Sequence, residues 1–260
     1  MLKALGTAST GMDAQTKQIE TIGNNLANAD TTSFKRSRVD FQDLLYQNIK
    51  EPGAATSAST QNPTGISIGV GTKVAGTMRD HTDGTLKHTE RQLDVAIEGS
   101  GFLAFQKPDG EVSYSRDGGL RIGTEGQLTN PDGFPLIPEI QIPPTSKSIN
   151  VAMDGKVTVT NDQNQQEEVG QIQLTTFANS AGLQAEGGNL YRISPASGAP
   201  VPGNPTEAGL GRLFQGYLEA SNVNPAREMT DMIRAQRMYE LNSKVISTSD
   251  QMMNALNNLR

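Results

Sequence analysis

Residues 223–259 read VNPAREMTDMIRAQRMYELNSKVISTSDQMMNALNNL and predict one long amphipathic helix. Asn224 is a suitable N-cap, Pro225 suits the first helical position, and no later glycine or proline interrupts the run. A helix of this length extends about 50 Å at ~1.5 Å per residue, so a small domain cannot cover it and it needs another helix. Its apolar side chains recur at sevens in two rows, Met232, Tyr239, Ile246 and Met253, and Met238, Val245, Met252 and Leu259.

The opposite end of the chain supplies a second apolar row with the same spacing. It consists of Leu5, Met12, Ile19 and Leu26, with Leu2, Ala8 and Ile22 on the same face. Heptad spacing at both ends predicts helices packed as a coiled coil, against each other or against neighbouring subunits. The alternative is two core helices of an ordinary globular domain. The candidate assembly residues are Leu5, Met12, Ile19, Leu26, Met232, Met238, Tyr239, Val245, Ile246, Met252, Met253 and Leu256.

The middle of the chain predicts an extended segment followed by β structure. Residues 51–71 are rich in Pro, Gly, Ser and Thr, which favours an extended or disordered segment, and Phe34 to Tyr46 could hold a short strand or helical turn. From Val74 to Phe214, apolar and polar residues alternate, and five Asp-Gly dipeptides predict hairpins.

The fold class is therefore α+β, with long N- and C-terminal helices around a central all-β domain of short antiparallel strands. The helices form a coiled-coil inner domain of residues 1–30 and 215–260. Residues 31–73 form an extended, Gly/Ser/Thr-rich connecting segment, and residues 74–214 form the outer β domain.

The composition points away from catalysis and from nucleic acid. The 260 residues carry a net charge of −6 without a Lys/Arg-rich run, and they include no cysteine and only two histidines, which we expect to be solvent-exposed. We predict no catalytic residue, no metal site and no cofactor; a β-rich hydrolase would need convergent acids or a nucleophile. Without an N-terminal signal or an 18-residue apolar run, the chain is expected to stay in the cytoplasm or to leave without a cleaved signal.

Six stretches of the sequence form recognisable motifs: Thr10–Ala14, Thr21–Asn28 and Thr32–Arg36 at the N-terminus, Asp94–Phe102 in the β region, and Gly216–Asn224 and Met232–Glu240 at the C-terminus. Together they resemble the motifs of bacterial flagellar rod and hook proteins. Two positions depart from the N-terminal motif: Gly23 stands where it usually has alanine, and Ser33 where it usually has glycine. Hook proteins are similar at both ends but carry an additional outer domain, for which 260 residues leave no room.

The resemblance implies a structural subunit of the flagellar basal body, closest in type to the distal rod subunits that transmit motor torque to the hook. The helices would form an inner tube around a channel, with the β domains outside and residues 31–73 as a segment specific to the distal rod type. The implied partners are further copies of the chain, proximal rod proteins, the hook protein, the surrounding basal-body ring proteins and the type III export apparatus, with neither nucleic acid nor a small-molecule substrate. The implied location is the basal body across the periplasm, reached without a cleaved signal peptide.

Two alternatives remain at this point. A proximal rod protein has a similar size but resembles this chain less between Phe41 and Gly71. A filamentous surface adhesin, in which a helical stalk presents a β domain, would equally explain the helices and the β centre. It would not explain the motif at residues 22–28 beside a matching C-terminus.

Overall fold

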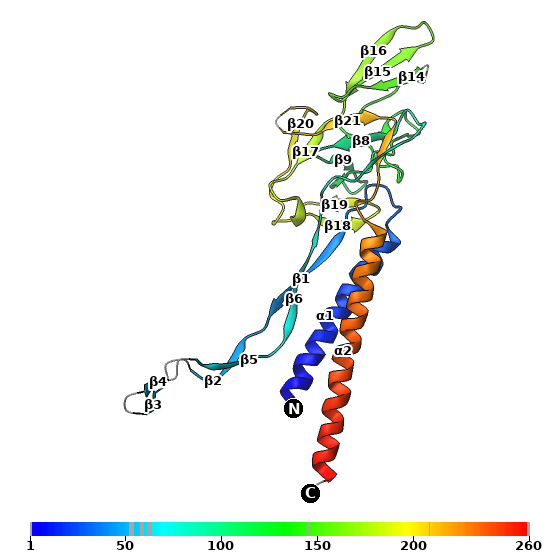
Figure 1. Cartoon of the computed structure of the whole chain (residues 1–260). Helices are drawn as coiled ribbons and strands as arrows, with labels where there is room; N and C mark the ends of the chain where they lie inside the picture. The colour runs from blue at the N-terminus through cyan, green and yellow to red at the C-terminus, as the bar shows by residue number, and fades with distance from the viewer. Residues whose placement is uncertain are drawn as a thin grey trace. The chain divides into compact units, whose positions relative to one another are not determined.

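The computed structural model describes residues 2–51, 55–57, 60–61, 64–144, 146–207 and 209–258, and it confirms the α+β class. Along the sequence, one helix precedes and one helix follows a β-rich stretch, as the colours and labels of Figure 1 indicate. The chain divides into two compact units. Unit 1 contains residues 1–27, 37–79 and 224–260, and unit 2 contains residues 28–36 and 80–223.

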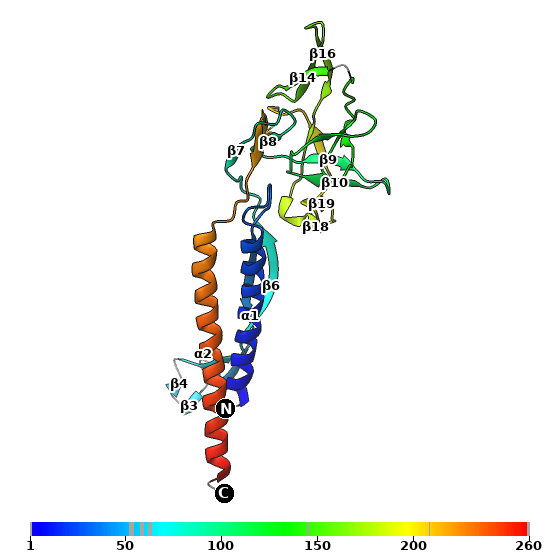
Figure 2. The same ribbon diagram turned by 90° about the vertical axis from the view of Figure 1, so that its right-hand side faces the viewer.

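The two helices of unit 1, α1 (Leu2–Ala27) and α2 (Pro225–Asn258), run antiparallel (Figure 2). Nδ2 of Asn25 donates to Oε2 of Glu228 over 3.1 Å. Towards the other end of α1, a Cβ added to Gly11 would lie 2.8 Å from Nδ2 of Asn242. Because this pairing places the start of α1 opposite the region of Gln251, the last turns of α2 continue beyond α1.

Small and polar side chains occupy most of the buried positions of the helix pair. Ala8 and Ala14 on α1 and Ala235 and Ser249 on α2 are buried, as is the larger Ile22. Small side chains let two helices approach closely. The predicted heptad residues lie around them and are only half-buried: Leu5, Met12, Ile19, Leu26, Met232, Ile246 and Met253.

Unit 1 also contains a long two-stranded ribbon, so the domain boundaries differ from the predicted ones. Strand β1 (Ser37–Asp43) pairs with β6 (Thr72–Arg79), and β2 (Tyr46–Lys50) pairs with β5 (Ile66–Gly69). The β-rich unit begins at Asp80 rather than at Val74, because residues 72–79 pair with β1 and pack with it against α1. The short strands β3 (Ala55–Ser57) and β4 (Thr60–Gln61) also pair, whereas the prediction for residues 52–54, 58–59 and 62–63 lies outside the described residues.

Unit 2 is built from short, mostly antiparallel strands. A five-stranded sheet has the order β13-β9-β10-β19-β18, and a three-stranded sheet has the order β14-β15-β16. The remaining strands pair as β8 with β21, β7 with β22, β17 with β20, and β11 with β12. The strands are β7 (Leu86–His88), β8 (Val95–Glu98), β9 (Leu103–Gln106), β10 (Val112–Ser115), β11 (Arg121–Ile122), β12 (Leu128–Thr129), β13 (Leu136–Ile137), β14 (Ser146–Val151), β15 (Lys156–Asn161), β16 (Gln166–Gln171), β17 (Leu174–Thr176), β18 (Gln184–Gly187), β19 (Leu190–Arg192), β20 (Val201–Gly203), β21 (Arg212–Gln215) and β22 (Tyr217–Glu219).

The C-terminal boundary of unit 2 lies at Val223, beyond the predicted boundary at residue 214, because β21 and β22 pair with strands of the β region.

Two apolar core clusters lie in unit 2. Branched aliphatic side chains dominate the larger cluster, as expected where sheets pack face to face. Its buried members are Val95, Ile97, Leu103, Phe105, Leu120, Leu128, Leu136, Ile140, Ile142, Val151, Val157, Val159, Ile172, Leu174, Leu190 and Leu213.

The Asp-Gly dipeptides do not all serve the role that the sequence predicts for them. Asp109-Gly110 joins the paired strands β9 and β10, and Asp154-Gly155 joins β14 and β15, as expected for hairpins. Asp117-Gly118 instead lies where the backbone approaches another strand: a Cβ on Gly118 would lie 1.6 Å from the carbonyl oxygen of Val95. Glycine is required there for space rather than for a turn.

We therefore expect Gly118→Ala to destabilise unit 2 by about 1–3 kcal/mol, since the added methyl group meets a backbone carbonyl that cannot rotate away. Gly119→Ala is the matched control, because the nearest atom to its Cβ, Oδ1 of Asp117, lies at 3.4 Å. Denaturant titration followed by circular dichroism measures both variants. Equal stability of the two would contradict the close approach at Gly118.

Candidate functional site

The surface of α2 carries a row of large apolar side chains that are exposed in the chain. We call Met238, Leu241, Val245 and Met252 the outer row; their exposed fractions are 44%, 57%, 46% and 45%. Residues spaced by three, four or seven share one side of a helix, so the outer row is continuous. Leu256, beyond the reach of α1, is 53% exposed.

The structure thus separates the candidate assembly residues of α2 into two groups. Met232, Ile246 and Met253 are half-buried, whereas Met238, Val245, Met252 and Leu256 are exposed. Tyr239, predicted to lie in the same row as Ile246, is 41% exposed. The predicted residue Leu259 lies outside the described residues.

No catalytic arrangement emerges from the described residues. Among them, no group of three or more His, Asp or Glu side chains could hold a metal ion, and no helix is long and apolar enough to cross a membrane. His88 is exposed and contacts the ring of Tyr217, as the sequence suggests. The prediction of an exposed His81 is wrong: the ring is partly covered, since Phe102 and Tyr191 pack edge-on against it.

A buried cluster of charges lies in unit 2, where the chain enters this unit after α1 and leaves it before α2. The side chains of Lys35 and Glu219 are fully buried and that of Arg116 is 2% exposed, whereas Asp83 at the edge is 45% exposed. Two basic and two acidic groups balance each other. Buried charges are tolerated when each is paired and hydrogen-bonded.

Glu219 connects the members of this charge cluster. Its Oε1 accepts from Nζ of Lys35 over 2.6 Å, and its Oε2 accepts from Nε of Arg116 over 2.8 Å. Oε1 also accepts from the backbone N–H of Gly84 over 2.8 Å. One carboxylate therefore ties together segments near residues 35, 84, 116 and 219.

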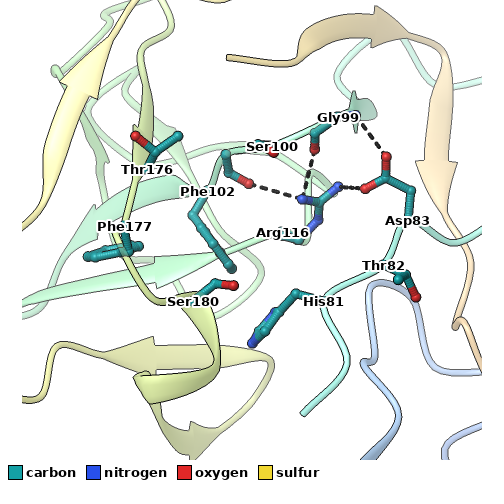
Figure 3. Close-up of a pocket in the computed structure, with 11 residues that line it drawn as sticks. His81, Thr82, Asp83, Gly99, Ser100, Phe102, Arg116, Thr176, Phe177 and Ser180 are labelled. Carbon is teal, nitrogen blue, oxygen red and sulfur yellow. Dashed lines mark hydrogen bonds and ion pairs between the residues drawn. The ribbon is translucent and has the colours of Figure 1, made fainter. Parts of the chain in front are cut away.

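Arg116 completes the cluster by binding backbone carbonyl groups. Figure 3 shows its guanidinium directed at Asp83 and at the turn that precedes Phe102. Nη1 donates to the carbonyl oxygens of Gly99 and Gly101 over 3.0 and 3.3 Å, and Nη2 donates to Oδ1 of Asp83 over 2.9 Å. The turn at residues 99–101 is thus held by a buried guanidinium.

The electrostatic balance within the cluster favours an ionised Glu219. Burial by itself raises the pKa of this carboxyl group, but the charges of Arg116 and Lys35 and their hydrogen bonds outweigh that effect. The pKa of Glu219 therefore lies below its ordinary value of 4.5.

Ser33 adapts the chain to this cluster at a position where the flagellar motif usually has glycine. Its φ of +57° lies in the left-handed region, which favours glycine. The hydroxyl group donates to the carbonyl oxygen of Arg116 over 2.9 Å, and the backbone N–H donates to the carbonyl oxygen of Glu219 over 2.8 Å. These two bonds stabilise serine in a conformation that costs a side chain about 1–3 kcal/mol.

A second buried polar junction lies within unit 1 and involves Asn25. Its side chain pairs with the backbone of Ser37 like a short strand, since Oδ1 accepts from the N–H of Ser37 and Nδ2 donates to its carbonyl oxygen, both over 2.9 Å. Nδ2 also donates to Glu228 in the first turn of α2. Asn25 thereby links the end of α1, the start of β1 and the start of α2.

A cavity of ≈ 400 Å³ lies beside Arg116 and is lined mainly by aromatic and hydroxyl side chains (Figure 3). Phe102, Phe177 and His81 form part of its wall, with Thr176 and Ser180. The guanidinium of Arg116 borders the cavity, but its hydrogen bonds go to protein acceptors. The geometry assigns no ligand to this cavity.

Comparison with known proteins relates all three parts of the chain to flagellar proteins. The family model "Flagella basal body rod protein" matches residues 5–35, the model of the flagellar hook protein FlgE/F/G D1 domain matches residues 96–159, and the C-terminal model of flagellar basal body rod FlgEFG proteins matches residues 215–259. Each matched segment thus contributes one residue to the charge cluster, namely Lys35, Arg116 and Glu219 in that order. None of the three is among the residues predicted from the sequence to be functional, although Lys35 and Glu219 lie within the flagellar motifs.

Full-length relatives give the same result. The chain is 48% identical over 260 residues to the flagellar basal-body rod protein FlgG of Buchnera aphidicola subsp. Acyrthosiphon pisum, covering 100% of both chains. It is 44% identical to FlgG of Borreliella burgdorferi, covering 100% of this chain and 99% of that protein. It is 37% identical to FlgG of Bacillus subtilis, covering 100% of each.

We expect Glu219→Gln to lower the free energy of unfolding of unit 2 by about 3–5 kcal/mol at pH 7, because it leaves the buried Lys35 without its counter-charge and Arg116 with only the half-exposed Asp83. In the wild type, the stabilisation from Glu219 is present above its unfolded-state pKa near 4.5 and is lost as the pH falls through the depressed folded-state pKa. The variant should lack this acid-dependent loss. Denaturant titrations at a series of pH values measure both effects.

The exposed Glu167→Gln is the control and should change stability by no more than about 0.5 kcal/mol. Parallel pH profiles for wild type and Glu219→Gln would contradict the role assigned to this carboxylate.

We expect the charge cluster to determine which fragment of the chain folds. A fragment of residues 74–214 keeps Arg116 but lacks Lys35 and Glu219, whereas residues 28–223 keep the whole of unit 2. We expect dispersed amide signals in an NMR spectrum of the longer fragment and a largely unfolded spectrum for the shorter one. Native dispersion in fragment 74–214 would show that the cluster is dispensable for folding.

Proposed function

Because this chain belongs to the FlgG family of flagellar basal-body rod proteins, we propose that it polymerises through the exposed side of its terminal helices. It is a structural subunit of the flagellar distal rod and not an enzyme. The proposal identifies the surface through which the subunits contact one another in the polymer. The main observation that supports it is the exposed outer row of α2.

The outer row is a large apolar surface that the chain itself does not cover. Contiguous exposed apolar side chains on a soluble protein mark interaction sites. In unit 1, α1 packs on the side of α2 that carries Ala235. Met238 and Val245 lie on the flank of that contact and stay 44% and 46% exposed, so this flank is available to another copy. The exposed Leu256 extends this surface past the end of α1.

The contact between copies is heterologous, since the outer row of one copy meets a different surface of the next. A heterologous contact that does not close into a ring generates a helical filament. Leu5, Met12, Ile19 and Leu26 on α1 are half-buried and supply the complementary surface in this proposal. Packed together, the helices of many copies would form the coiled-coil inner tube.

The ribbon of unit 1 provides a second apolar surface. Leu45, Tyr46 and Ile49 are 87%, 58% and 58% exposed, and Ile66 and Ile68 on the opposite strand are 49% and 42% exposed. A two-stranded ribbon has no core of its own and gains stability by packing on other elements. We assign it to contacts with neighbouring rod subunits.

We extend the proposal to the partners and the route of the subunit. The location in the flagellar basal body follows from the family, and the rod would join proximal rod proteins to the hook inside the surrounding ring proteins. Export through the type III apparatus without a cleaved signal peptide is part of the same proposal. The relatives' names support a rod subunit over a surface adhesin, and FlgG relatives over the whole chain support the distal type over a proximal rod protein.

We expect Val245→Asp to abolish polymerisation of the full chain while leaving the fold of the free subunit intact. Val245 is 46% exposed in the free chain, so a carboxylate there stays hydrated until another copy covers it. Burial of an unpaired charge then costs several kcal/mol in every subunit of the polymer. Sedimentation and electron microscopy measure the polymer, and circular dichroism measures the fold.

Lys244→Gln is the matched control, since it changes the neighbouring exposed residue without placing a charge in the outer row. Ile246→Asp is a less selective test, because Ile246 is half-buried within the chain and its replacement also weakens the helix pair. Normal polymer formation by Val245→Asp would show that the outer row is not part of the interface.

A further inference from the structure

The methionines of this chain are concentrated in α2. The sequence contains nine methionines but neither cysteine nor tryptophan, so methionine is the side chain that mild oxidants attack most readily. Five of the nine lie between Pro225 and Asn258: Met229, Met232, Met238, Met252 and Met253. More than half of the methionines that could be oxidised therefore lie on one helix.

The exposed methionines of α2 include two members of the outer row. Met238 and Met252 are 44% and 45% exposed, so a dissolved oxidant can reach their sulfur atoms. Met232 and Met253 are half-buried and are less accessible. Met153, in unit 2, is 55% exposed and provides a reference far from α2 in sequence.

We propose that Met238 and Met252 are oxidation sites whose modification prevents a free subunit from joining the polymer. This inference rests on the proposed function, because it assumes that the outer row is covered by another copy. Hydrogen peroxide is the oxidant considered. The thioether sulfur takes one oxygen atom and becomes a sulfoxide, while the peroxide is reduced to water.

The sulfoxide changes the outer row from apolar to polar. Methionine fits irregular apolar contacts because it is flexible and polarisable, and its sulfoxide disrupts such methionine-rich surfaces. In the free chain the S=O group is hydrated, so the fold of unit 1 tolerates it. In the polymer the group would be buried without a hydrogen-bond donor, a burial that costs free energy in every subunit.

The same contact makes the assembled polymer resistant to the oxidant. Once a neighbouring copy covers Met238 and Met252, peroxide no longer reaches their sulfur atoms. Oxidised free subunits are thus excluded from the polymer, whereas assembled subunits are protected from oxidation. Methionine sulfoxide reductases act on the two sulfoxide epimers and would return an excluded subunit to the assembly-competent pool.

The test uses the full chain and hydrogen peroxide. Free wild-type protein is oxidised, the sulfoxide at each methionine is measured by mass spectrometry, and polymerisation is followed by sedimentation. We expect loss of the sedimenting fraction with unchanged helix content, and recovery after treatment with the two reductases. The double variant Met238→Leu/Met252→Leu should polymerise equally well before and after peroxide, since leucine conserves volume and does not oxidise.

Met153→Leu is the matched control and should remain as sensitive to peroxide as the wild type, because its outer row is unchanged. Oxidised wild type that polymerises normally, or a double variant that remains peroxide-sensitive, would overturn the inference. So would a loss of helix content in oxidised wild type, which would place the damage in the fold rather than at the contact.

A second measurement separates this inference from the proposed function. Wild-type polymer is exposed to peroxide, and the oxidation rates of Met238 and Met252 are compared with that of Met153. If Met238 and Met252 oxidise more slowly than Met153 in the polymer, the proposed interface is supported. Normal assembly of oxidised subunits would then contradict only the oxidation inference. If Met238 and Met252 oxidise at equal rates in the polymer and in the free chain, no other copy covers the outer row. That outcome would contradict both the proposed function and the oxidation inference.

Discussion

Glu219 supplies the interaction on which unit 2 depends. Its carboxylate holds Lys35 and Arg116 within 2.6 and 2.8 Å, in a site from which all three side chains are almost completely excluded from water. Such a cluster is costly to bury unless every charge is paired, so no member can be lost singly without exposing the others to the full desolvation cost. The arrangement couples the segment after α1 to the segment before α2, and it makes the fold of unit 2 conditional on both.

The helix pair of unit 1 follows a different physical rule. Small side chains at Ala8, Ala14 and Ala235 bring the two helices close, and this packing uses only part of the surface of each. The longer helix, α2, keeps large apolar side chains on the side that α1 does not reach. A monomeric protein would be expected to replace them by polar residues, whereas in the polymer that we propose a neighbouring copy covers them.

Buried polar groups also explain two features of the flagellar motifs. Asn25 completes the backbone hydrogen bonds of Ser37 and joins them to Glu228. Ser33 occupies a left-handed conformation that glycine would adopt without strain, and its hydroxyl group compensates through Arg116. Asn25 and Ser33 therefore stabilise the backbone conformation rather than take part in a chemical reaction.

Several predictions failed where a residue's role depended on distant parts of the chain. Asp117-Gly118 has the composition of a hairpin turn, but glycine is needed there because the carbonyl group of Val95 leaves no room for a Cβ. His81 lies in a polar stretch, yet Phe102 and Tyr191 partly cover its ring. Residues 74–79 were predicted to belong to the β domain, but in unit 1 they pair with residues of β1 that lie about 30 to 40 positions earlier.

The sequence by itself determined the two terminal helices, the β-rich centre and the relation to flagellar proteins, because these depend on local periodicity and on continuous motifs. Only the tertiary structure decided which row of α2 packs on α1 and which stays exposed, since heptad spacing identifies two adjacent rows without ranking them. It likewise decided the pairing of Lys35 with Glu219, which are 184 residues apart. No local pattern encodes such a pair, because the contact exists only when the strands around it have folded.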